Sequence, residues 1–136
     1  PEMTTYVLDA SAWLRLFLSD GPAVPGLDQA AQDVEIGAAS FIAPELIVVE
    51  AGHALVRKVR RKQIRAADWP ALWQDMRRVP IELVAVDAHM DDALALAVRH
   101  NVSVYDALYL AVAIHIGAKL FTADEALQTA ARAAGV

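Results

Sequence analysis

Short β-prone apolar runs alternate along this chain with longer segments of helical periodicity, and this alternation restricts its fold more than any other feature. The pattern predicts strands at residues 5–8, 40–43, 81–86 and 119–122. It predicts helices at residues 10–18, 27–34, 44–62, 66–78, 88–100, 103–116 and 123–134, with Pro44 in the first turn of the third. Strands that alternate with helices are typical of a parallel sheet covered by helices, so we expect an α/β domain.

Size and composition fit a single domain at residues 3–136. Pro1 and Glu2 precede Met3 and are expected to be a remnant of protein expression. The absence of cysteine excludes a disulfide scaffold, a thiolate zinc site and a cysteine nucleophile, and it favours a cytoplasmic location. No apolar run approaches the roughly 18 residues of a membrane span. The net charge of −5 argues against a protein that holds nucleic acid through its overall charge.

Acidic residues stand at positions where a parallel sheet would bring them together. Asp9 follows the first predicted strand, and Asp124 follows the last. Asp106 opens an apolar helix that leads into the last strand, and Glu50 interrupts an apolar helix surface after the second strand. Because ligands of such sheets bind beyond the carboxyl ends of the strands, where the strand order reverses, we expect the four side chains to meet there.

Three of these acids have an alternative role as helix caps. Asp9 can accept hydrogen bonds from the free amides of the helix that it precedes. Ser103 and Asp106 have the spacing of a capping box, and Thr122 opens a second box ahead of Asp124. Each acid taken alone is explained as well by capping as by chemistry.

Glu50 cannot be a cap, because it lies well beyond the first turn of its predicted helix. At about 100° per residue it shares one face with His53, Arg57 and Arg61. The alternative for this face is an ordinary solvated stripe of charged side chains. Glu50 is therefore the more informative acid.

Four carboxylates at one place would repel one another unless a cation is shared among them. Mg²⁺ prefers a few carboxylates together with water and phosphate oxygens, and Mn²⁺ is expected to replace it. One or two such ions can activate water against a phosphodiester. The residues therefore indicate metal-dependent phosphodiester hydrolysis.

Four ordered motifs, which together span nearly the whole chain, resemble a known family. Residues 9–11, 44–55, 105–111 and 122–124 are similar to the signature of PIN-domain ribonucleases, and most of all to the VapC-type toxins of bacterial toxin–antitoxin pairs. The resemblance implies a three-layer domain with parallel strand order 3-2-1-4, often with a fifth strand, although this chain stops at Val136.

The resemblance also implies roles for particular residues. The family's metal site corresponds to Asp9, Glu50, Asp106 and Asp124. Thr122 matches a polar residue that assists there, and Ser11 is expected to orient Asp9. These acids and Thr122 are the predicted catalytic residues.

A VapC-type protein is expected to be a toxin that cleaves RNA and leaves 5′-phosphate and 3′-hydroxyl ends. Ser11, Arg57 and Arg61 are the candidate RNA contacts, although a basic run at a helix end is equally typical of a solvated surface. The expected partners are RNA, a second copy of the chain, and an antitoxin that lays an apolar helix in a groove beside residues 10–18.

Two other functions remain open from the sequence. One is a PIN-fold binding module without catalytic activity. The other is a phospho-accepting receiver domain, which would need an adjacent acidic pair after the first strand and a lysine at the end of a late strand. Asp9 stands alone, and Lys119 begins its strand, so the receiver alternative is the weaker one.

Overall fold

A four-stranded parallel sheet forms the centre of the computed structural model, which describes residues 3–19 and 21–136. The strand order is β3-β2-β1-β4, as expected. The strands are β1 (Thr4–Leu8), β2 (Ala39–Pro44), β3 (Ile81–Val84) and β4 (Lys119–Phe121). The described residues contain no fifth strand, which stays a prediction, and the expectation for residues 1–2 lies outside the described range.

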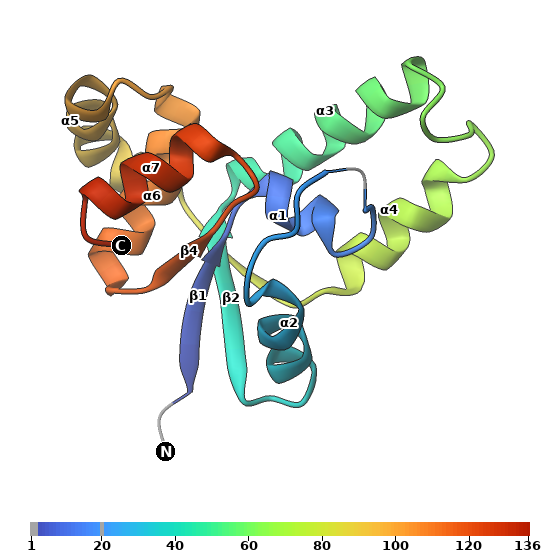
Figure 1. The fold of residues 1–136 in the computed structure, drawn as a ribbon, viewed down its shortest axis with the longest axis horizontal. Coiled ribbons are helices and arrows are strands. Elements are labelled where there is room, and N and C mark those ends of the chain that lie inside the picture. Colours follow the sequence, from blue (N-terminus) through green and yellow to red (C-terminus); the bar gives the residue numbers. More distant parts are fainter. Residues whose placement is uncertain (1–2, 20) are drawn as a thin grey trace.

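Helices cover both faces of this sheet and complete the three layers (Figure 1). On one side lie α1 (Ala10–Arg15), α2 (Leu27–Glu35), α3 (Leu46–Arg60) and α4 (Trp69–Arg78). On the other lie α5 (Met90–His100), α6 (Val104–Ile116) and α7 (Glu125–Ala133), with a short 3₁₀ turn, η1 (Asp87–His89), before α5. The α/β fold class is confirmed. None of the helices in the described part of the chain has the length and apolarity to cross a membrane.

The core lies on both faces of β1 and β2, where parallel strands are buried. Val7 and Leu8 of β1 are fully buried, and α6 packs across β1, β2 and β4 with every residue from 107 to 113 buried. A helix that is apolar on all sides belongs inside a domain. The burial of α6 fixes the position of its first turn, which carries Asp106.

The structure corrects the prediction that Pro44 begins a helix. Pro44 is the last residue of β2 and pairs with Val84 of β3, and α3 begins only at Leu46. The pairing of β1 with β2 ends at Val7 and Ile42, so Pro44 lies past the point where a missing N–H would remove a bond to β1.

Other predicted boundaries were wrong by a few residues. The helix predicted at 10–18 ends as a regular helix at Arg15, because the amides of Leu16 and Phe17 bond three residues back and tighten the last turn. The helix predicted at 66–78 begins at Trp69, with Pro70 in its first turn. The third strand is shorter than predicted and ends at Val84.

Candidate active site

Two acids follow adjacent strands at the edge of the sheet where the strand order reverses. The amide of Asp9, directly after β1, donates to the carbonyl of Phe121, the last residue of β4, at 3.2 Å. Asp124 follows β4 by three residues and lines the same cavity as Asp9. Strand pairing therefore brings together two side chains that are 115 residues apart in the sequence.

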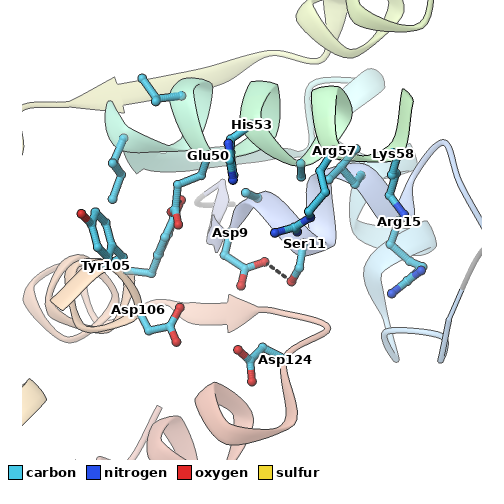
Figure 2. A pocket seen from close by; sticks show the side chains of 16 residues that line it. Asp9, Ser11, Arg15, Glu50, His53, Arg57, Lys58, Tyr105, Asp106 and Asp124 are labelled. Atoms are coloured by element: carbon cyan, nitrogen blue, oxygen red, sulfur yellow. Dashed lines mark hydrogen bonds between the residues drawn. The ribbon is translucent and has the colours of Figure 1, made fainter. Parts of the chain in front are cut away.

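The cavity at this edge has a volume of about 790 Å³ and is lined by all four predicted acids (Figure 2). Asp9, Glu50, Asp106 and Asp124 come from four different elements of the chain: the end of β1, helix α3, the first turn of α6 and the start of α7. The expectation that the acids share one pocket agrees with this placement.

Asp9 is the most buried of the four, with 5% of its surface exposed. Its Oδ1 accepts hydrogen bonds from the Ser11 hydroxyl at 2.7 Å and from the Ala12 amide at 2.8 Å, so Asp9 also caps α1. Burial raises the pKa of Asp9 to about 6, partly offset by Thr122, Ala12 and Ser11, and the Asp106 charge raises it further. Asp9 is therefore a helix cap and also a residue of the cavity.

Ser11 connects the end of β1 with the end of β4. Its hydroxyl, which donates to Asp9, accepts from the Ala123 amide at 2.9 Å and lies 3.4 Å from the Thr122 hydroxyl. Thr122 in turn accepts from the Asp124 amide at 3.0 Å. This chain of hydrogen bonds fixes the backbone on which two of the acids stand, and it agrees with the expected orienting role of Ser11.

The cap of α7 differs from the predicted capping box. Asp124, not Thr122, is the N-cap, and its Oδ1 accepts from the amides of Ala126 at 2.9 Å and Leu127 at 3.4 Å. Thr122 is buried at the end of β4, one step too early to reach these amides. Its hydroxyl is used to hold the turn before the helix.

Asp106 interacts electrostatically with each of the other three acids. Its amide donates to the Ser103 hydroxyl at 3.0 Å, which confirms Ser103 as the cap of α6. Burial raises the pKa of the Asp106 carboxyl, and the neighbouring Asp124 charge raises it again. In Figure 2 the carboxylates of Asp106 and Asp124 point toward each other across the cavity.

Glu50 is half-buried on the wall opposite Asp106. Burial raises the pKa of its carboxyl, the Tyr109 hydroxyl lowers it, and the Asp106 charge raises it. The Tyr109 hydroxyl donates a hydrogen bond to Glu50 Oε1 at 2.5 Å. The predicted acids therefore influence one another electrostatically through Asp106.

The donor set of this cavity fits a hard divalent cation. All four acidic side chains offer carboxylate oxygens, and the raised pKa values of three of them reflect burial and like charges without a compensating cation. Within residues 3–19 and 21–136, no three acidic or histidine side chains lie close enough together to coordinate one metal ion. A cation held by three of these acids would therefore require their side chains to move closer together.

Cations line the other end of the same cavity (Figure 2). Arg57 and Lys58 come from α3, and Arg15 comes from α1, on the facing wall. His53 shares the α3 face with Glu50 and Arg57, as the periodicity predicts. Arg61 is the C-cap residue of α3 and is not among the residues that line the cavity.

Sequence reasoning missed Tyr109 as a member of the site. Its position three residues after Asp106 on a helix places both side chains on one face, which was the available signal. The apolar surroundings of Tyr109 in the sequence make it look like an ordinary core residue, and it is indeed buried.

Comparison with known proteins shows similarity in sequence and in fold. A sequence profile described as the PIN domain matches residues 6–133. The chain is 34% identical over 118 residues to Ribonuclease VapC9 of Mycobacterium tuberculosis, which covers 87% of this chain and 84% of that protein. It is 34% identical over 87 residues to Ribonuclease VapC3 of Pyrobaculum aerophilum, which covers 61% of this chain and 65% of that protein. The crystal structure of PAE2754 from Pyrobaculum aerophilum matches with a TM-score of 0.72 and 25% identity, over 93% of this chain and 79% of that one.

Proposed function

This chain belongs to the PIN-domain family and is similar to its VapC ribonucleases, and from this membership we propose that it is a divalent-metal-dependent endoribonuclease. The activity would be that of the toxin in a toxin–antitoxin pair. The observation that carries the proposal is the convergence of Asp9, Glu50, Asp106 and Asp124 on one cavity. Capping accounts for Asp9 and Asp124 but not for a half-buried glutamate in mid-helix.

The residues divide the work of hydrolysis between them. Asp9, Asp106 and Asp124 would hold the cation. Glu50 would hold it directly or through water, and would help to position the attacking water. Mg²⁺, with Mn²⁺ as a substitute, supplies the positive charge that activates water and stabilises the leaving oxygen of a phosphodiester. Ser11 and Thr122 hold the Asp9 side chain and the Asp124 backbone in place through hydrogen bonds at the ends of β1 and β4.

Removal of divalent metal tests this proposal directly. We expect the purified protein to cleave RNA in Mg²⁺ or Mn²⁺ and to lose this activity in EDTA, because the acids cannot bind a phosphate without a cation between them. The measurement is end-mapping of the fragments, which should carry 5′-phosphate and 3′-hydroxyl ends. Cleavage that continues in EDTA at the same rate as in Mg²⁺ would contradict the metal-dependent mechanism.

The cationic end of the cavity supports RNA as the substrate. Arg57 lies on the same face of α3 as Glu50, within the cavity, so an RNA phosphate beside the cleaved one can reach its guanidinium. Such phosphate contacts position a strand without reading its sequence. Ser11 and Arg61 stay predictions as RNA contacts, since the Ser11 hydroxyl is already bonded to Asp9 and Arg61 lies beyond the cavity.

Replacement of Arg57 by Ala should weaken RNA binding at all sequences alike. In a cleavage-deficient Asp106→Asn background, the slope of log Kd against log salt should fall by about 0.7, the value for one lost phosphate contact to a single strand. Filter binding at several salt concentrations measures the Kd for RNA and its dependence on salt. Arg99→Ala on α5, across the sheet, is the matched control. Arg61→Ala tests whether RNA phosphates also contact the end of α3 beyond the cavity. An unchanged slope in Arg57→Ala would exclude this contact.

An antitoxin is the proposed protein partner. A second cavity of about 580 Å³ lies beside the end of α1. Leu16, Phe17 and Val34 give it an apolar part that could receive the apolar side of a partner helix. The rest of its lining includes charged side chains: Asp28, Glu35, Asp75 and Arg78. Trp13 and Leu14 are buried in the core and do not line this cavity, and the expected groove beside residues 10–18 stays a prediction. Homodimer formation stays a prediction.

A further inference from the structure

The hydroxyl of Tyr109 is the buried polar group that the proposed reaction leaves unassigned. Tyr109 has 1% of its surface exposed, yet its Oη reaches the cavity and donates to Glu50 Oε1 at 2.5 Å. It stands one turn after Asp106 on α6, so this helix contributes both an acid and a hydroxyl to the same cavity.

Glu50 needs such a partner more than the other anchored acids do. Asp9 and Asp124 each accept amide hydrogen bonds at the free N-terminus of a helix. Glu50 lies in the interior of α3, where the amides are already used by the helix, and its longer side chain has more rotatable bonds. Without a bond from elsewhere its carboxylate would sample several positions in the cavity.

The phenol suits this task because it keeps its proton. A tyrosine hydroxyl ordinarily loses its proton only near pH ~10, so it is a hydrogen-bond donor at neutral pH. It therefore acts as a donor toward the carboxylate and does not add another negative charge to the cavity.

We propose that Tyr109 is a positioning residue that clamps Glu50 and so sets the carboxylate of Glu50 for divalent-cation binding in this cavity. The inference rests on the proposed function and adds to it a residue from outside the acidic set. Partners that orient a metal-binding side chain commonly change metal affinity by 10- to 100-fold when they are removed.

The test is the affinity for Mn²⁺ alone, measured from the free Mn²⁺ signal in electron paramagnetic resonance without RNA. We expect Tyr109→Phe to bind Mn²⁺ about 10-fold more weakly than the wild-type protein. The change keeps the ring in the core, and the unfolding midpoint checks that the fold is retained. Tyr6→Phe is the matched control, because Tyr6 packs on Phe121 in β4, outside the cavity, and should bind Mn²⁺ like the wild type.

A double-mutant cycle separates clamping from a general structural effect. In the Glu50→Gln background, Tyr109→Phe should cost less than about twofold in Mn²⁺ affinity, because the carboxylate that it positions is gone. An equal loss in both backgrounds, or wild-type affinity in Tyr109→Phe alone, would overturn this inference and leave the proposed nuclease standing. A wild-type protein that neither binds Mn²⁺ nor cleaves RNA would instead overturn the proposed function, and this inference with it.

Discussion

Replacement of Asp106 by Asn is expected to lower the rate of RNA cleavage by about a thousandfold, the scale on which removal of one charge-stabilising group affects catalysis. Asp106 is the acid with the most charged neighbours in the cavity: its charge raises the pKa of both Asp9 and Glu50, and Asp124 raises its own. An amide in its place keeps the volume but removes the negative charge that a cation needs. Asp9→Asn should have an effect of the same order.

The fold should survive this change. The bond that caps α6 joins the backbone amide of residue 106 to the Ser103 hydroxyl, so it does not depend on the carboxylate. Cleavage rates at saturating Mg²⁺, compared with the unfolding midpoint of each variant, therefore separate loss of chemistry from loss of structure. Asp92→Asn is the matched control, since Asp92 is exposed in the first turn of α5 and outside the cavity.

Two outcomes would change the interpretation. Undiminished cleavage by Asp106→Asn and Asp9→Asn would mean that the metal site lies elsewhere. A wild-type protein that binds RNA but never cleaves it, with or without metal, would favour the catalytically inactive PIN module.

The placement of the acids at strand ends could be predicted because it depends on topology. In a parallel sheet all carboxyl ends meet at one edge, so Asp9 and Asp124 had to come close once β1 and β4 were neighbours. The same reasoning required no knowledge of side-chain conformation. Glu50 was found for a related reason, since a helix that leaves the same edge carries its first turns past the site.

Details that depend on tertiary contacts could not be predicted in this way. Pro44 fits the start of a helix by local preference, but pairing with Val84 keeps it in the strand. Thr122 and Asp124 are both good caps, and only the course of the backbone after β4 decides between them. The bond from Tyr109 to Glu50 joins residues 59 apart on helices that lie on opposite sides of the sheet, which no local pattern encodes.

Stability should also report the electrostatic cost of the acidic cavity. Without divalent metal, Asp9→Asn should raise the free energy of unfolding above that of the wild-type protein by about 3 kcal/mol at pH 7. At pH 4 the two proteins should differ little. The pKa of Asp9 is raised from 3.8 to about 6 by burial, and each pKa unit corresponds to about 1.4 kcal/mol. As the pH rises from about 4 to 6, the unfolded chain loses the Asp9 proton while the folded protein keeps it. The wild-type protein therefore loses stability as the pH rises through this range. Above about pH 6 its free energy of unfolding has fallen by the full amount.

The difference between variant and wild type is the quantity to measure, because it cancels the titration of the other acids. Urea unfolding in EDTA at half-unit steps from pH 4 to pH 8 would give it. Asn can still accept the Ala12 amide bond at the start of α1, so the helix cap contributes almost equally in both proteins. A difference that stays constant with pH would mean that burial does not raise the pKa of Asp9 in the metal-free protein. A difference that grows with pH would show that the cavity stores unfavourable charge, which a bound cation can relieve.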